Sequence, residues 1–328
     1  MRIAIDAMGG DNAPVAIVKG AVAVAQERGD IDIVLVGNRQ RISEICPMPA
    51  NVEIVEAPEV IENEDKPLMA IRRKRNSSMV VALGMVKEGT AQAVVSAGNT
   101  GALMAGASLI VGRIPGVTKP ALAPVLPTRT GRGTVAVDIG ATMDPKPENL
   151  FQYALMGTLY ARTVFGLENP RVGLLNVGVE SEKGNELAKQ TYGLLAQSEL
   201  NFIGNVEARE VLEGRCDVLI CDGFVGNVLL KSMEGVAYTL FSQMKEAVRK
   251  GGVKGKVGAL LLKDTLKALK DKMDYSKYGG SPLLGINGVC IKCHGSADAG
   301  NVKNAILNQA YVLVKEQTIA SMTKIMGE

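Results

Sequence analysis

Tryptophan is absent from the 328 residues, which include only seven tyrosines, five phenylalanines and one histidine. With so few aromatic side chains, a platform on which nucleic-acid bases stack is not expected. The charges also nearly cancel, with 37 Lys and Arg against 34 Asp and Glu, and this balance does not indicate a polyanion-binding surface. Nucleic acid is therefore not an expected partner.

Long apolar runs are also missing. The uncharged stretch at residues 94–112 contains Ser, Asn, Thr and many Gly and is too polar for a transmembrane helix. The start of the chain, MRIAIDAMGGDNAP, has no basic region followed by an apolar one, so a signal peptide is not expected. The five cysteines are odd in number and irregularly spaced, which is typical of reduced thiols in the cytoplasm.

What the chain does contain is a regular alternation of two patterns. Short β-branched runs predict strands at 2–6, 31–37, 52–57, 93–96, 122–126, 134–138, 171–176, 201–203, 218–221 and 289–292. Helical patterns lie between them at 14–27, 77–88, 147–163, 184–198 and 225–250. This alternation predicts an α/β fold with a mostly parallel sheet. Since no Pro/Gly/Ser-rich linker divides the chain, we expect one catalytic unit over residues 1–328.

Seven of the predicted strands are followed by Gly together with Asn, Asp, Glu, Ser or Thr. These loops are residues 6–14, 97–101, 139–144, 177–185, 204–207, 222–227 and 293–298. Any one of them can be an ordinary turn or helix cap. Seven on one sheet edge favour a crevice that binds an anion at helix N-termini. The sequence has no GxxxxGK[ST] motif, and no GxGxxG follows the first strand, which disfavours a nucleotide site.

The same loops carry a family resemblance. DAMGGDNAP, VSAGNTGALMA, LNVGVESEKGNE, FIGNVEAR, CDGFVGNVLLK and PLLGINGVCIKCHGSADA together resemble the bacterial phosphate acyltransferases, from residue 1 to about residue 322. The resemblance implies a three-layer α/β/α fold like that of phosphate acetyltransferases and isocitrate dehydrogenases, and a homodimer. It implies transfer of a long fatty acyl chain from acyl carrier protein to inorganic phosphate for phospholipid synthesis, with no cofactor. Thr142 stands where the family usually has Asn.

The implied reaction turns a thioester and phosphate into an acyl phosphate and a thiol. It needs an anion cradle, a donor for the developing oxyanion and a proton for the leaving thiolate. No enzyme nucleophile is indicated, since GxSxG is absent. For the cradle we expect the helix start at Asn99, Thr100 and Gly101, with Gly9, Gly10 and Ser296 as further phosphate-binding residues.

Four residues are the catalytic candidates: His294, Lys183, Asn227 and Asp222. The single histidine is the only imidazole available for acid–base work or oxyanion stabilisation. The lysine can neutralise phosphate charge and the asparagine can donate to an oxygen. Further polar groups expected to support them are Asp6, Asp11, Asn205 and Glu207. The alternative is that these residues have no catalytic role and are a solvated lysine, a structural histidine and helix caps.

A CxxCH string at residues 290–294 matches the attachment motif of c-type haem. We reject that interpretation, because the chain shows no export signal and Cys290 lies in an apolar run. One CxxC pair with one His is also a weak metal signal without a second ligand pair. No metal is expected.

One segment is strongly basic. Residues 245–277 hold ten Lys or Arg and four acids, and their leucines recur at helical spacing. They predict a protruding amphipathic helical insertion for an anionic membrane surface or acyl carrier protein. The expected contacts are Leu260, Leu261, Leu262, Lys263 and Lys267. The alternative is a helix whose leucine side packs on the core.

Three other functions stay open at this point. A coenzyme-A-dependent phosphate acetyl- or butyryltransferase has the same fold, although the basic segment argues mildly against it. A metal- and NAD-dependent hydroxy-acid dehydrogenase would need metal-binding carboxylates and a nicotinamide site. A membrane-bound scaffold would explain the basic segment but not seven polar loops. On the main interpretation the protein is cytoplasmic and peripherally associated with the membrane.

Overall fold

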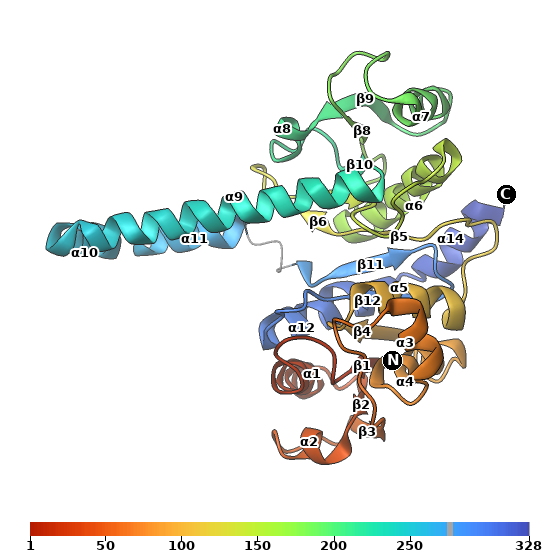
Figure 1. The fold of residues 1–328 in the computed structure, drawn as a ribbon, viewed down its shortest axis with the longest axis vertical. Helices are drawn as coiled ribbons and strands as arrows, with labels where there is room; N and C mark the ends of the chain where they lie inside the picture. The colour runs from red at the N-terminus through yellow and green to blue at the C-terminus, as the bar shows by residue number, and fades with distance from the viewer. Residues whose placement is uncertain (274–277, 328) are drawn as a thin grey trace.

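The computed structural model describes residues 1–273 and 278–327, without the side chains of residues 269–273. Residues 274–277 of the predicted basic insertion, and the side chains of Leu269 and Met273 in its leucine pattern, lie outside the described residues. The described residues form two β-sheets, one in each half of the molecule, with helices packed on both faces (Figure 1).

The larger sheet has the strand order β3-β2-β1-β4-β12-β11-β5. The first five of these are mutually parallel, and β11 and β5 are antiparallel to their neighbours. The strands are β1 (Arg2–Asp6), β2 (Asp32–Gly37), β3 (Val52–Glu56), β4 (Ala93–Ser96), β5 (Ala121–Leu122), β11 (Ser281–Leu284) and β12 (Val289–Lys292). The helical segments of this half are α1 (Val15–Glu27), α2 (Arg39–Ser43), α3 (Pro67–Arg73), α4 (Ser78–Lys87), α5 (Thr100–Gly106), η1 (Ala107–Val111), α12 (Ala299–Asn304), η3 (Ala305–Ala310), α13 (Tyr311–Lys315) and α14 (Thr318–Gly327).

The second sheet has the order β6-β7-β10-β8-β9, in which only the edge strand β6 is antiparallel. Its strands are β6 (Val125–Leu126), β7 (Thr134–Val137), β8 (Val172–Asn176), β9 (Phe202–Glu207) and β10 (Val218–Ile220). Its helices are α6 (Pro147–Phe165), α7 (Glu186–Ala196), α8 (Ala208–Val211) and the start of α9 (Gly223–Lys250).

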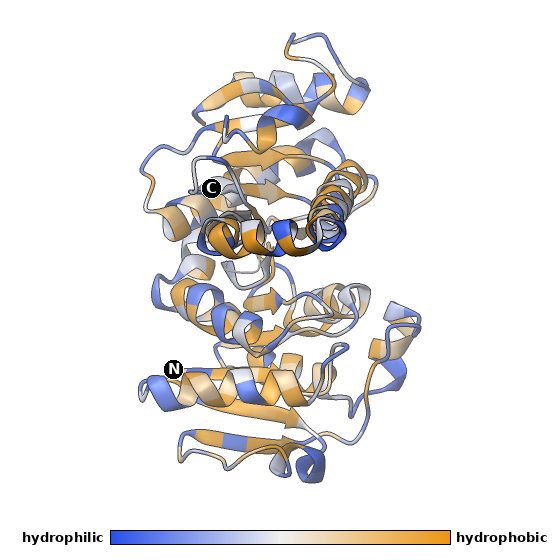
Figure 2. Ribbon diagram, turned by 90° about the vertical axis from the view of Figure 1, so that its left-hand side faces the viewer, coloured by the Kyte–Doolittle hydropathy of each residue, from blue (hydrophilic) through white to orange (hydrophobic). Residues whose placement is uncertain are grey.

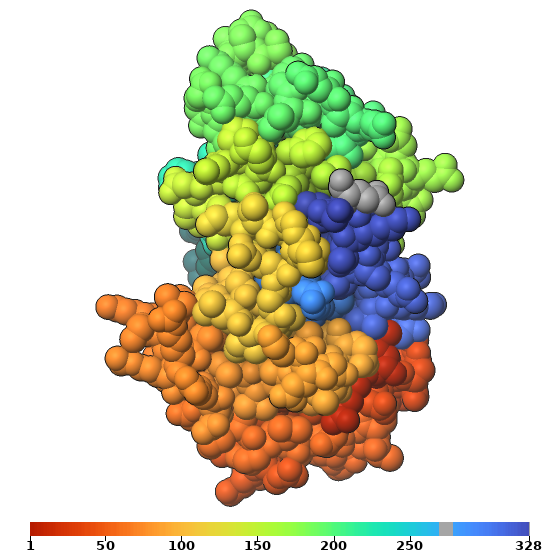
Figure 3. Space-filling view, turned by 90° about the vertical axis from the view of Figure 1, so that its right-hand side faces the viewer, coloured from red at the N-terminus to blue at the C-terminus, as the bar shows by residue number. Residues whose placement is uncertain are grey.

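The apolar strands explain why the sheets sit inside the molecule. All four residues of β4, β7 and β12 are buried, as expected for parallel strands that have helices on both faces. Figure 2 shows strands of the molecule as mostly apolar, among helices that carry both polar and apolar residues. Between the halves, α14 packs against α6, and Figure 3 shows the C-terminal helix beside the segment before β5, across the junction of the sheets.

The structure confirms the predicted α/β class and corrects three details of the strands. Residues 122–126 do not form one strand, because β5 joins the larger sheet and β6 the smaller one. The strand β11 was missed, since Pro282 and the flanking glycines mask its short apolar run. The polar loops also lie on the edges of two sheets instead of one.

The basic segment projects from the body as an arm (Figure 1). The helix α9 runs for 28 residues and is followed by α10 (Gly252–Leu261) and α11 (Lys263–Met273). Within the described arm α10 has no buried residue, and Leu260, Leu261 and Leu262 are 71%, 80% and 53% exposed. These leucines therefore do not pack on the core. In the part of the chain that the structure covers, we find no helix with the length and apolar character needed to cross a bilayer.

Candidate active site

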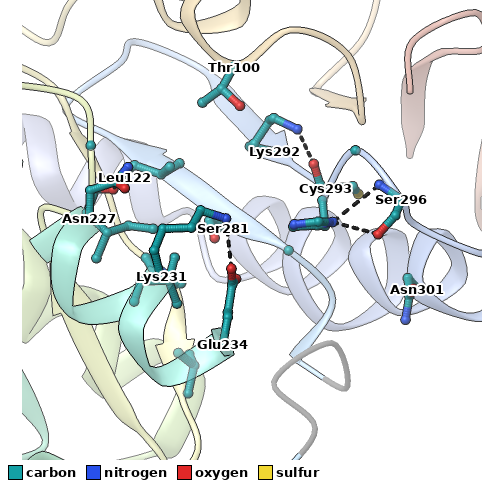
Figure 4. A pocket seen from close by; sticks show the side chains of 18 residues that line it. Thr100, Leu122, Asn227, Lys231, Glu234, Ser281, Lys292, Cys293, Ser296 and Asn301 are labelled. Atoms are coloured by element: carbon teal, nitrogen blue, oxygen red, sulfur yellow. Dashed lines mark hydrogen bonds and ion pairs between the residues drawn. The ribbon is translucent and has the colours of Figure 1, made fainter. Parts of the chain in front are cut away.

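A pocket of about 360 Å³ lies between the two sheets. The larger sheet supplies Thr100, at the start of α5, and the loop that follows β12. The smaller sheet supplies Gly140, after β7, and one face of α9. Asn227, Lys231 and Glu234 share that face because residues four and seven apart point the same way on a helix. Figure 4 shows Asn227 and Lys231 on one side of the pocket and Lys292 on another.

Lys292, the last residue of β12, is the most unusual group in this pocket. It is 7% exposed, and its Nζ donates to the carbonyl of Ala97 at 3.3 Å and to that of Cys293. Among the described residues no carboxylate forms an ion pair with it. Burial lowers the pKa of Lys292 to about 8. Its hydrogen bonds go only to carbonyls, and the charges of Asp6 and Asp11 offset only part of the cost of burying an ammonium group, so its charge favours an anion in the pocket beside it.

A second cation lies opposite. Lys231 forms an ion pair with Glu234 at 2.7 Å, and Glu234 is the one acid among the described residues that line the pocket. The positive charge of Lys231 adds to the lowering of the pKa of Lys292, which places the two ammonium groups within each other's field. The pocket therefore has more positive than negative side chains.

His294 lies at the mouth of the pocket and is exposed. Its Nδ1 accepts the backbone N–H of Ser296 at 3.2 Å and lies 2.8 Å from the Ser296 hydroxyl. Since a backbone N–H can only donate, Nδ1 is the acceptor nitrogen and Nε2 carries the proton. In this arrangement Nε2–H is the group that the ring offers to a ligand.

Four of the predicted site residues meet in this pocket: Thr100, Asn227, His294 and Ser296. Asn227 donates its Nδ2 to the carbonyl of Ile139 at 3.3 Å, and that bond ties α9 to the loop after β7. Because the four come from both sheets, only the folded chain brings them together.

The other predicted phosphate-binding residues do not line this pocket. Asn99 caps α5 by accepting the N–H of Ala102 at 2.9 Å, and its amide donates to carbonyls of the 62–65 loop. Gly101 lines a neighbouring cavity. At Gly9 a Cβ would lie 2.5 Å from Asp6 Oδ2, and at Gly10 it would lie 2.9 Å from Ala97 Cβ, so both positions require glycine for close approach.

The predicted acids of the first loop also have structural partners. Asp6 is buried and accepts the hydroxyls of Ser78 at 2.5 Å and Ser96 at 2.6 Å. Burial raises the pKa of Asp6, and these hydrogen bonds oppose the rise. Asp11 is exposed, and its backbone N–H donates to Gly295 at 2.8 Å. This bond joins the loop after β1 to the loop after β12.

The remaining candidates lie around the second sheet, outside the pocket lining. Lys183 is exposed in the loop after β8, and Asp222 caps α9 by accepting the N–H of Val225 at 2.9 Å. Asn205 donates to the carbonyl of Glu180 at 2.7 Å, and Glu207 forms an ion pair with Arg209 at 2.6 Å. Asn205 and Glu207 belong to β9, so the expectation that they follow the strand in a loop was wrong.

Asp138, directly after β7, shapes the wall of the pocket and was not among our predictions. Its carboxylate accepts backbone N–H groups from Leu122 at 2.9 Å, Gly140 at 3.1 Å, Ala141 at 2.9 Å and Thr142 at 2.6 Å. Burial raises the pKa of Asp138, against the effect of these four donors. One side chain thus holds the turn that carries Gly140 and also joins it to β5.

Sequence reasoning missed Lys231 and Lys292. The lysine that ends the apolar run Val289–Lys292 is a usable signal of a site residue, because lysine is rarely buried unless it is paired. Lys231 lies four residues after Asn227, on the same face of the helix. Neither signal identifies the pocket, because the sequence alone does not show that β12 and α9 face each other.

The cysteines near this site are not expected to act as nucleophiles. Cys290 and Cys293 are buried, and burial raises the pKa of each thiol to about 12. They belong to separate core clusters, which agrees with opposite faces of β12. Over residues 1–273 and 278–327, no group of three or more His, Cys, Asp or Glu side chains is placed to bind a metal.

Solved structures that share this fold include phosphotransacylases. The chain superposes on a phosphotransacetylase from Streptococcus pyogenes with a TM-score of 0.62 and 15% identity, covering 96% of this chain and 94% of that one. A branched-chain phosphotransacylase from Enterococcus faecalis V583 gives 0.60 and 14%, covering 96% and 99%. At these identities the likeness defines the fold, which is the phosphotransacetylase-like fold that we expected.

Sequence relatives define the family. Residues 1–321 match the model of the family described as "Fatty acid synthesis protein". A phosphate acyltransferase from Brevibacillus brevis is 54% identical over 310 residues, covering 94% of this chain and 92% of that protein. One from Bacillus cereus is 48% identical over 326 residues, covering 99% and 98%. The chain belongs to the bacterial phosphate acyltransferase family and is an acyltransferase.

Proposed function

We propose that this protein transfers a long-chain fatty acyl group from acyl carrier protein to inorganic phosphate and so supplies acyl phosphate for phospholipid synthesis. Relatives named phosphate acyltransferase support phosphate as the acceptor. The observation that carries the proposal is buried Lys292, without a carboxylate partner among the described residues, at a pocket between the sheets. Since that pocket draws residues from both sheets, we treat the two halves as one catalytic unit.

The chemistry follows from the pocket's charges. Phosphate bound between Lys292 and Lys231 uses one oxygen to attack the thioester carbonyl carbon. A new carbon–oxygen bond forms, the carbon–sulfur bond breaks, and the thiolate leaves with a proton taken from the solvent or the site. Nε2–H of His294 and the amide of Asn227 donate to the thioester carbonyl oxygen, which becomes negative after phosphate attacks and before the thiolate leaves. Cys290 and Cys293, with their raised pKa values, supply no competing nucleophile.

The direct test is phosphate-dependent release of thiol from a palmitoyl-loaded acyl carrier protein, with acyl phosphate trapped as its hydroxamate. We expect release from this donor and much slower release from acetyl- or butyryl-coenzyme A. If only the coenzyme A donors react, the protein is a short-chain phosphate acyltransferase. If none reacts, the proposal fails.

Changing His294 to alanine is expected to lower kcat more than it raises the phosphate KM, because the lost N–H serves the developing oxyanion and not the bound phosphate. A loss of about tenfold or more in kcat fits a removed donor. Steady-state kinetics at varied phosphate concentration measure both quantities, with Ser296→Ala testing the partner of Nδ1. Wild-type kinetics in folded His294→Ala would remove the ring from the mechanism.

Phosphate binding is expected to weaken as the pH rises through about 8, where Lys292 loses its proton. Above this midpoint each pH unit lowers the charged fraction, and therefore the apparent affinity, by about tenfold. Calorimetry with inorganic phosphate between pH 7 and 10 gives the curve. His294→Ala is the control, and a midpoint that vanishes in this variant belongs to the histidine instead.

We also propose that the arm binds acyl carrier protein or a cytoplasmic anionic membrane surface, in a protein that works as a homodimer. Its described part combines the exposed leucines 260–262 with Lys263 and Lys267. Burying two leucines supplies about 3 kcal/mol or more, and adjacent cations add attraction to anionic lipid.

For the membrane, the double change Leu260→Glu/Leu261→Glu is expected to reduce flotation with phosphatidylglycerol vesicles by at least about tenfold, since it removes apolar area and adds negative charge. Leu68→Glu/Met69→Glu is a matched control, because those neighbours are 45% and 39% exposed on α3. Equal flotation of both double variants would contradict membrane binding through the arm.

A further inference from the structure

A second cavity, of about 600 Å³, adjoins the candidate active site. Its walls come from α5 and η1 on the larger sheet and from the turn after β7 on the smaller one. The segment that leads to β5 closes a third side. The residues that line it are Gly101, Met104, Ala105, Ser108, Leu109, Arg113, Thr118, Lys119, Pro120, Ala141, Thr142, Met143 and Asp144.

The two cavities lie side by side along both walls. On α5, Thr100 lines the active-site pocket and the next residue, Gly101, lines the second cavity. After β7, Gly140 lines the first and Ala141 the second. Consecutive Cα atoms are about 3.8 Å apart, so the two cavities are next to each other at both walls.

The inner surface of the second cavity is mainly apolar. Met104 and Ala105 are half-buried there, and Leu109 and Met143 are 54% and 47% exposed. Large apolar side chains this exposed, gathered around one cavity, indicate a surface that a ligand covers.

The polar groups of the same walls are used within the protein. The guanidinium of Arg113 donates to the carbonyl of Thr118. Thr142 donates its hydroxyl to the carbonyl of Pro120 at 3.4 Å and its N–H to Asp138 at 2.6 Å. The charged residues Lys119 and Asp144 are exposed. Apart from Ser108, Lys119 and Asp144, little in these walls remains to hydrogen-bond a polar ligand.

We infer that this second cavity holds the hydrocarbon chain of the acyl donor, and this inference rests on the proposed function. The carbon that phosphate attacks is the first carbon of the acyl chain, so the chain must leave the reaction centre into an adjoining space. Apolar walls stabilise each buried methylene by about 0.8 kcal/mol. The exposed leucines of α10 cannot hold these first methylenes, because they lie at the far end of the arm (Figure 1). The cavity therefore favours long chains over short ones.

Two substitutions test the inference in opposite physical ways. Leu109→Glu adds a charge to an exposed position on the wall, and Ala105→Trp fills the cavity with bulk. We expect kcat/KM for palmitoyl donors to fall at least about tenfold, which is the loss of one to two buried methylenes, while butyryl donors on the same carrier change less than about twofold. Leu194→Glu is the control for a new charge, since Leu194 is 38% exposed on α7 and outside this cavity.

Each outcome decides the matter. A drop in the palmitoyl-to-butyryl ratio in both variants, but not in the control, supports the chain site. An unchanged ratio overturns it, and so does an equal loss with both donors, since the cavity would then serve the reaction centre. In all of these cases the wild-type protein makes acyl phosphate. If the wild type makes none, the proposed function itself has failed.

Discussion

Replacing Lys292 with methionine is expected to lower kcat/KM for phosphate by about 100- to 1,000-fold, which lies within the range found when one partner of a buried, hydrogen-bonded charge pair is removed. The side chain is buried, lines the pocket and forms no ion pair with a carboxylate among the described residues, so we expect phosphate to be the anion that pairs with it. The loss should fall mainly on the phosphate KM. Lys189→Met, at an exposed lysine of α7, is the control and should behave as wild type.

The same substitution should make the folded protein more stable. Burial lowers the pKa of Lys292 from 10.5 to about 8, so the folded state binds this proton less tightly than the unfolded state. Below pH 8 the buried charge destabilises the fold by up to about 3 kcal/mol, and the penalty disappears as the pH rises from 8 to 10.5. Methionine removes it at every pH. Urea unfolding at pH 7 measures the gain, and a variant less stable than wild type would contradict this account of the site.

Changing Asp138 to alanine is expected to destabilise the protein by about 3–5 kcal/mol, because it leaves four backbone donors without their acceptor. The affected N–H groups belong to Leu122 and to the turn at residues 140–142. Denaturant unfolding gives the loss directly, and activity should fall as well, since this turn lines both cavities. Asp144→Ala, an exposed acid on the same loop, should cost less than about 0.5 kcal/mol. Similar losses in both variants would show that the four hydrogen bonds contribute little.

Much of the fold could be predicted from the sequence, because parallel strands buried on both faces are almost continuously apolar. The runs at β1, β2, β4 and β12 stand out for this reason. The sequence did not predict which of the two sheets each strand joins. Leu122 and Val125 are close together in an apolar run, yet they belong to different sheets, and only long-range pairing separates them. The missed strand β11 contains Pro282, which weakens a strand signal.

The site was predictable at the level of loops and not of individual charges. Thr100, Asn227, His294 and Ser296 follow strand ends, which is where ligands gather in parallel sheets, and they share one pocket. Asn99 and Asp222 have the same signal but cap helices, since polar residues at helix starts serve both purposes. Lys231 and Lys292 occupy regular elements, a helix and a strand, and become neighbours only when the two sheets are assembled.

The helix α9 begins beside the pocket and ends at Lys250, near the tip of the arm. From Lys231 to Lys250 it rises about 29 Å at 1.5 Å per residue, roughly the thickness of a bilayer's hydrocarbon core. If α9 were perpendicular to the membrane, with leucines 260–262 in contact with the lipid, the pocket would lie far above the headgroups. If α9 were parallel to the membrane, the pocket would lie close to them. On the proposed function, the orientation of α9 on the membrane would set how far an acyl phosphate must travel through water.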